Sequence, residues 1–211
     1  MLAGLMLTMA LMAPELPNPI EKAVDYYQKV DSYQTIIKSY VGSKSDSPDI
    51  VRYYYNKSGA VRMEVVEPFN GAVLIYNPVT ELVKLWLFGY GSVPSFSLSP
   101  ENKWIQSSSG QRVDRSDIGA LYEDVILLQR QGKTTVVGTE TVEKQAALYV
   151  IVKGNPGVAV EGVSRFDLWF DVQTSLPLKV ISYKADGSQI ERIEMSEYQV
   201  NPAFPKGFFD H

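Results

Sequence analysis

RFDLWFDVQTSLPLKVISYKADG, residues 165–187, contains two runs of β-forming residues joined by a turn, and a second turn follows the second run. The first run ends at Asp171 and the second begins after Leu176. Aromatic and branched aliphatic side chains dominate both runs, which favours strands, and none of the polar side chains between them is a strong catalyst. The stretch therefore predicts a hairpin of an antiparallel sheet with an apolar inner face.

Similar runs occupy most of the chain. They are YQTIIKSYVG, DIVRYYYNK, GAVRMEVVEP, GAVLIYNP, ELVKLWLFG, TTVVGTETV, AALYVIVKG and QIERIEMSEYQV. Several repeat at a spacing of about ten residues and are separated by turn residues, which is the rhythm of an antiparallel meander. No internal repeat or linker interrupts them, so residues 18–211 are predicted to form one domain.

Two segments have helical rather than strand periodicity. PIEKAVDYYQKV, residues 19–30, follows Asn18, which is a suitable N-cap. DIGALYEDVILLQRQG, residues 117–132, follows Ser116, which we expect to cap this second helix. Residues 89–115, between the strands and the second helix, are rich in Ser and Gly and are predicted to be a loop with one helical turn after Ser99.

The composition excludes several classes of function. Of 211 residues, 21% are charged and the net charge is -4, with basic and acidic residues intermixed, so nucleic-acid binding is not expected. There is no Cys, and the one His is His211, so thiol chemistry, disulfides and common zinc sites are not available. GKTT at residues 132–135 lacks the upstream Gly of a phosphate-binding loop. In ERIE at residues 191–194, Arg192 and Glu194 point to the face opposite Ile193, which is typical of a solvated strand face. We expect no enzyme, no metal site and no cofactor.

The first 13 residues contain no charge and consist mainly of Leu, Met and Ala. This run is too short to span a bilayer, for which about 20 residues are needed, and it predicts the h-region of a signal peptide that lacks its basic n-region. The alternative is a buried N-terminal helix. No Cys follows, so a lipid anchor is not expected, and export in soluble form to the periplasm is predicted.

The hairpin at residues 165–187 resembles the one repeated across the LolA-like family of periplasmic lipoprotein carriers and outer-membrane lipoprotein-sorting proteins. In that family a strand ends in Asp, a turn contains Thr and a small residue, Leu-Pro begins the return strand, and an Asp-Gly turn follows. The matching residues here are Asp171, Thr174, Leu176, Pro177, Asp186 and Gly187. The resemblance implies an α+β fold, with a strongly curved, unclosed antiparallel β-barrel and helices that cover its concave side.

The resemblance also implies a function, namely holding acyl chains or the lipid part of lipoproteins in an apolar hollow. Lipid transport or outer-membrane lipoprotein sorting would then involve a delivery partner at the inner or outer membrane. The carriers have an arginine in the first hairpin that is tied to ligand release. Lys57 occupies this region here, and Arg62 lies on the next strand.

Taking one face of each strand gives a candidate lining for the hollow. It consists of Val61, Met63, Val65, Leu74, Tyr76, Leu85, Leu87, Leu168 and Phe170. A slip of one residue would exchange the two faces of a strand, so which face is concave is left open. The alternative function is a periplasmic protein-interaction or envelope-stress-sensing module on the same fold, which would have a filled core and an external apolar patch.

Overall fold

Two α-helices and eleven strands form the regular structure of the computed structural model, which describes residues 18–43 and 47–210. The expected signal segment, residues 1–13, lies outside the described residues. The helices are α1 (Pro19–Tyr27) and α2 (Ile118–Arg130), and a short 3-10 helix, η1, spans Val113–Arg115. The strands are β1 (Ser32–Val41), β2 (Asp49–Asn56), β3 (Val61–Glu67), β4 (Val73–Asn77), β5 (Leu82–Trp86), β6 (Ser95–Leu98), β7 (Gly132–Val142), β8 (Gln145–Gly154), β9 (Arg165–Asp171), β10 (Pro177–Tyr183) and β11 (Gln189–Val200).

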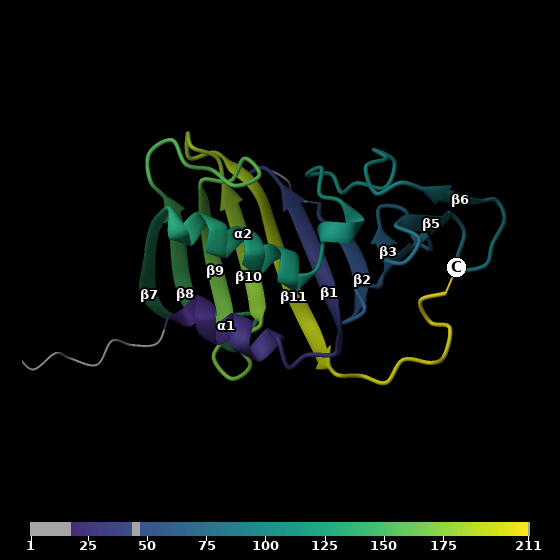
Figure 1. The fold of residues 1–211 in the computed structure, drawn as a ribbon, viewed down its shortest axis with the longest axis horizontal. Coiled ribbons are helices and arrows are strands. Elements are labelled where there is room, and N and C mark those ends of the chain that lie inside the picture. Colours follow the sequence, from purple (N-terminus) through teal and green to yellow (C-terminus); the bar gives the residue numbers. More distant parts are fainter. Residues whose placement is uncertain (1–17, 44–46, 211) are drawn as a thin grey trace, which may run out of the picture.

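All these strands belong to one antiparallel sheet in the order β6-β5-β4-β3-β2-β1-β11-β10-β9-β8-β7. Two meanders, β1 to β6 and β7 to β11, are joined where β1 pairs with β11, for example at Ile37 opposite Met195. The edge strands β6 and β7 lie at opposite ends of the sheet and do not pair with each other (Figure 1). The predicted fold class, an unclosed antiparallel sheet with helices on one side, is confirmed.

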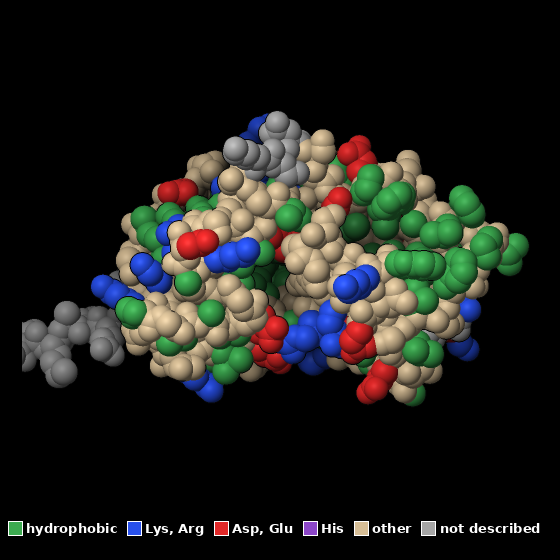
Figure 2. Space-filling view, turned by 90° about the horizontal axis from the view of Figure 1, so that it is seen from above, with side chains coloured by type: hydrophobic (Ala, Val, Ile, Leu, Met, Phe, Trp, Pro, Cys, Tyr) green, Lys and Arg blue, Asp and Glu red, His purple; other side chains and the backbone are tan. Residues whose placement is uncertain are grey.

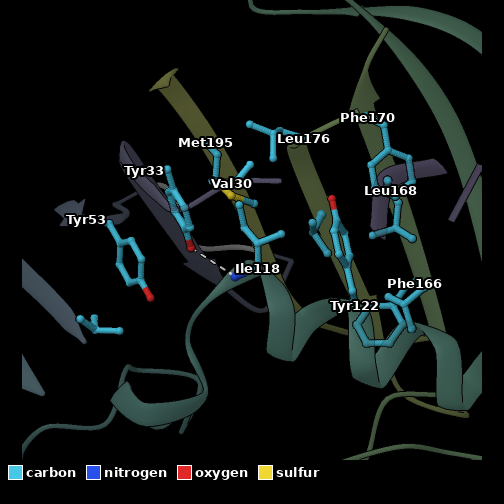
Figure 3. Close-up of a cluster of buried hydrophobic side chains, with 14 of the residues drawn as sticks. Val30, Tyr33, Tyr53, Ile118, Tyr122, Phe166, Leu168, Phe170, Leu176 and Met195 are labelled. Carbon is cyan, nitrogen blue, oxygen red and sulfur yellow. Dashed lines mark hydrogen bonds between the residues drawn. The ribbon is translucent and has the colours of Figure 1, made fainter. Parts of the chain in front are cut away.

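The two helices cover only part of the concave face. Figure 1 shows α1 and α2 lying across β7 to β11, whereas the connection from β6 to α2 passes over the region of β2 to β5. Beneath α2 the core is tightly filled, with Leu168 and Val125 fully buried and Phe170 only 2% exposed (Figure 3). The half of the sheet without a helix is therefore the place where space can remain.

The start of α2 is fixed by an N-cap residue. Asp117 is its N-cap and accepts hydrogen bonds from the backbone N–H groups of Gly119 and Ala120. The expectation that Ser116 caps this helix is wrong by one residue, because the hydroxyl of Ser116 instead bonds to the carbonyl of Val113 at 2.6 Å and completes η1. Both residues are good caps, and only the backbone path decides between them.

Residues 89–115 are more ordered than the sequence predicts. They contain β6, which pairs with β5 and places Phe96 opposite Leu85. The run SFSL alternates polar and apolar residues, but four residues surrounded by Ser, Gly and Pro give a weak strand signal. The remainder of the segment has no strand. A turn does follow Ser99, where the N–H of Asn102 donates to the carbonyl of Ser99 at 2.9 Å, but the one short helix of the segment is η1, further along the chain.

The convex face has its own clusters of aromatic side chains. Trp169 stacks on Tyr149 with ring centroids 4.3 Å apart, and the ammonium of Lys179 lies over the ring of Trp169 at 4.4 Å. Near β3 and β5, the C-terminal residues pack Phe208 and Phe204 against Tyr54. These contacts shield part of the convex face from solvent. Both faces of the sheet therefore carry apolar side chains. Among the described helices, neither is long and apolar enough to cross a membrane.

Candidate functional site

A cavity of about 480 Å³ lies on the concave face in the half that α2 leaves uncovered. Its wall is formed by strands β1 to β5, β10 and β11, and its cover is the segment that leads from β6 into α2, together with the first turn of α2. Ligand pockets of proteins generally have volumes of about 300–1,000 Å³, so the space is large enough to hold a small molecule or part of a lipid.

The body of the cavity is apolar. Its described apolar lining includes Ile37, Val51, Tyr53, Met63, Val65, Ala72, Leu74, Leu85, Leu87, Ile105, Val113, Ile118, Leu121, Val180, Ile193 and Met195. The strand residues among them come from alternate positions of neighbouring strands. Met63, for example, stands opposite Tyr53 on β2 and opposite Leu74 on β4. Because opposite residues in an antiparallel pair point to the same face, this part of the sheet presents a continuous apolar wall.

One end of the cavity is polar. Ser39 on β1 stands opposite Asp49 on β2, and Glu191 lies at the same end of β11. The Ser39 hydroxyl donates a hydrogen bond to the carboxylate of Glu191, and Ser108 of the covering segment donates to Asp49 at 2.5 Å. The first bond joins β1 to β11, and the second joins the covering segment to β2.

Glu191 is an unusual residue for an apolar wall, since only 8% of it is exposed. Burial raises the pKa of its carboxyl, hydrogen bonds from Ser39 and Ser109 act in the opposite direction, and the nearby charge of Asp49 raises it further. The sequence predicts that Arg192 and Glu194 lie on the face opposite Ile193, and the structure agrees. Glu191 lies on the cavity side of β11, where the sequence predicted no site. Only Arg192 and Glu194 of this motif belong to the outer face, where they pair with each other at 3.3 Å.

The mouth of the cavity has exposed apolar side chains on the side of β3 to β6. Phe69, Leu87 and Trp104 line the cavity, yet they are 75%, 40% and 78% exposed. We call these three residues the apolar rim. Figure 2 looks at the molecule from above and shows a hollow with hydrophobic side chains inside it, and further hydrophobic side chains gathered toward the end formed by β3 to β6. The apolar wall thus continues outward to solvent.

The predicted lining residues share the concave side, but the structure divides them into two groups. Met63, Val65, Leu74, Leu85 and Leu87 line the cavity. The others do not line it: Val61, Leu168 and Phe170 are buried in the packed core, and Tyr76 is half-buried against that core. Ligand contact by the first group remains a prediction.

The two basic residues predicted to act in release lie away from the cavity lining. Lys57 is exposed and forms an ion pair with Asp31 at 3.0 Å. Arg62 is buried on the convex face, where it donates to the backbone carbonyl of Phe208 at 2.9 Å and pairs with Glu64 at 2.8 Å. A role of either residue in release remains a prediction, and the contacts of Arg62 are structural.

Sequence reasoning missed several cavity residues. Ile193 and Met195 lie on β11 at the alternation that the sequence displays, so the pattern could have identified them once β11 was placed beside β1. Trp104 and the serines of the covering segment have no such signal, because they come from irregular chain. Within the described part of the chain, no group of three or more His, Cys, Asp or Glu residues could hold a metal ion.

No family model and no curated protein matches the sequence. Among solved structures, an uncharacterized conserved protein from Thermus thermophilus has a TM-score of 0.56 at 10% identity, with 92% of this chain and 94% of that chain covered. The lipoprotein LppX of Mycobacterium tuberculosis has a TM-score of 0.54 at 11% identity, with 88% and 95% covered.

A third similar structure is MucB in complex with MucA(peri), which has a TM-score of 0.55 at 15% identity. The match covers 92% of this chain but 58% of that chain, so the chain spans a little more than half of MucB. At these identities the likeness shows the fold alone. The fold is LolA-like, and the resemblance seen in the hairpin at residues 165–187 is confirmed at that level.

Proposed function

We propose that this protein is an exported, non-enzymatic carrier that holds acyl chains of lipids or of lipidated proteins in the concave cavity. The observation that supports this most directly is the apolar cavity of about 480 Å³, which opens through the apolar rim. A core that packed solidly against the sheet would leave no such space. The wall contributed by Met63, Leu74 and Leu85 offers contacts along the length of a hydrocarbon chain.

Burial of a chain in this cavity would provide useful affinity. Each buried methylene contributes about 0.8 kcal/mol, so a chain with about ten buried methylenes gains roughly 8 kcal/mol before the cost of ordering. The loss of chain freedom and of rigid-body motion removes part of this gain. Reversible binding is what a carrier requires, because the cargo must be released at its destination.

A place in the cell envelope fits this activity. The uncharged segment at residues 1–13 supports export to the periplasm, and LppX, which shares the fold, is itself a lipoprotein. In this proposal the carrier takes part in lipid transport or in the sorting of outer-membrane lipoproteins. It would then meet a delivery partner at the inner or the outer membrane.

Native mass spectrometry of the protein purified from a bacterial host tests the proposal. We expect adducts with the masses of lipids, and we expect the delipidated protein to bind the uncharged dye Nile red and to release it when 1-palmitoylglycerol is added. Protein that is uniformly free of lipid, and that binds neither Nile red nor 1-palmitoylglycerol, would contradict a carrier function.

A second candidate is a protein-interaction or envelope-stress-sensing module. It is favoured by the exposed apolar rim, which could accept a protein partner, and by the fold shared with MucB in its complex with MucA(peri). Leu85→Arg separates the two candidates, because a charge in the cavity should abolish lipid uptake while leaving a partner bound at the rim. A pull-down from envelope extract with this variant and with the unaltered protein makes the comparison.

A further inference from the structure

The charged side chains that line the cavity are mostly acidic. They are Asp49, Glu67, Asp117 and Glu191, and Arg112 is the basic residue among the described lining residues. The acids do not lie together as one cluster. Glu67 is exposed at the mouth and Asp117 caps α2, whereas Asp49 and Glu191 form the polar end of the apolar wall.

Arg112 is already engaged by carboxylates of its own segment. Its guanidinium donates two hydrogen bonds to Asp114, at 3.0 and 2.6 Å, and forms an ion pair with Glu101 at 2.9 Å. Two parallel hydrogen bonds between a guanidinium and a carboxylate are strong, so Arg112 is expected to stay paired with Asp114. The cavity therefore offers an anionic ligand no free arginine or lysine among its described lining residues.

The polar end is instead rich in hydrogen-bond acceptors. A carboxylate has about four acceptor sites, and the bonds from Ser39 and Ser109 to Glu191 and from Ser108 to Asp49 occupy only part of them. The hydroxyl groups of these serines point toward the carboxylates as donors, so they are not available to stabilise a negative ligand. Charge repulsion between a ligand and a carboxylate is stronger in a partly dry cavity than in water.

Resting on the proposed function, we propose that the cavity selects amphiphiles whose polar end donates hydrogen bonds and has no negative charge. The hydrocarbon chain lies along the wall of Met63, Leu74 and Leu85, and the hydroxyl or ammonium head group lies between Asp49 and Glu191. Acylglycerols and long-chain amines belong to this class, and free fatty acids do not. Discrimination comes from repulsion of the wrong head group as well as from attraction of the right one.

Displacement of Nile red from the delipidated full chain tests this selectivity. The competitors are 1-palmitoylglycerol, hexadecylamine and palmitate, at about pH 8, where the amine is a cation and the fatty acid is an anion. We expect palmitate to need a concentration at least about tenfold higher than either of the other two. Glu191→Gln and Asp49→Asn should each narrow that difference by strengthening palmitate binding.

Glu194→Gln provides the matched control, because this residue lies on the same strand but on the outer face, paired with Arg192. This variant should leave the concentrations at which the three competitors displace Nile red in the same order as for the unaltered protein. Palmitate that displaces the dye as well as 1-palmitoylglycerol does would overturn the selectivity and leave the carrier function intact. If none of the three competitors displaces the dye, both the proposed carrier function and the proposed selectivity are contradicted.

Discussion

The hydroxyl of Tyr33 on β1 accepts a hydrogen bond from the backbone N–H of Ile118, the first residue of α2, at 3.2 Å (Figure 3). Two further tyrosines reach the same point. Tyr27 of α1 donates to Asp117 at 3.1 Å, and the hydroxyl of Tyr53 lies 3.0 Å from that of Ser116. Three phenol groups from three elements thus fix the position at which the covering segment ends and α2 begins.

Tyr33→Phe is expected to lower the free energy of unfolding by about 1–3 kcal/mol, because it leaves the buried N–H of Ile118 without its acceptor. Urea denaturation measures this change. Tyr26→Phe is the control, since Tyr26 is half-buried and its hydroxyl has no hydrogen bond to a described residue, and a loss of less than about 0.5 kcal/mol is expected there. Equal losses in the two variants would contradict the anchoring role of Tyr33.

Val65→Trp should fill the cavity and reduce lipid uptake. Val65 lines the cavity from β3, whereas its neighbour Val66 does not, so Val66→Trp introduces the same side chain on the same strand outside the cavity. We expect at least about tenfold weaker Nile red binding for the first variant and little change for the second. Unaltered uptake by Val65→Trp would show that the dye binds elsewhere.

Glu191 should make the stability depend on pH. Because burial raises the pKa of its carboxyl above the usual 4.5, the folded state binds more protons than the unfolded state between that value and the raised pKa. Stability contributed at this site is therefore lost as pH rises through that window. Glu191→Gln should equal the unaltered protein in stability below pH 4.5 and exceed it at neutral pH.

Urea titrations at a series of pH values test this prediction, with Glu194→Gln as the variant that should retain the original pH dependence. A Glu191→Gln protein that gains no relative stability toward neutral pH would show that the folded state does not penalise the ionised carboxylate at this site.

Replacing the two basic residues near the first hairpin should lower the free energy of unfolding by very different amounts. Arg62→Ala removes a buried guanidinium that lies 4.4 Å from the ring centre of Phe208 and bonds to its carbonyl, so a loss of about 2–4 kcal/mol is expected. Lys57→Ala breaks an exposed ion pair and should cost less than about 1 kcal/mol. Chemical denaturation measures both.

The release of bound Nile red should be recorded for the same two variants. A change in the release rate of Lys57→Ala without a change in stability would support the release role that the family resemblance implies. The absence of any effect on release would restrict both residues to structural roles.

Much of the sheet could be predicted because strand signals are local. Alternation in VRMEV places Val61, Met63 and Val65 on one face, and the turn residues after Asp171 fix the hairpin of β9 and β10. The helices follow from their periodicity for the same reason. β6 was missed because four residues provide too short a pattern, and the N-cap was misplaced because Ser116 and Asp117 are both good caps.

The cavity could be predicted only in part, because its limits depend on contacts far apart in sequence. Alternation assigns Leu168 and Leu85 equally to the concave face, but α2 covers the first and leaves the second facing open space. The burial of Glu191 likewise depends on Ser39 and on the covering segment, neither of which is near it in the chain. A strand pattern specifies a face, and the crossing of a helix decides which part of that face is filled.

The pairing of β1 with β11 has a consequence for folding during synthesis. Strand β1 is internal in the finished sheet, yet its partner β11 spans residues 189–200, so one edge of β1 stays open until these residues have emerged from the ribosome. Open strand edges invite pairing with other chains, and closure over such a separation is slow. The nascent polypeptide therefore has a prolonged aggregation-prone stage, during which a chaperone that shields residues 32–41 would raise the yield of folded molecules.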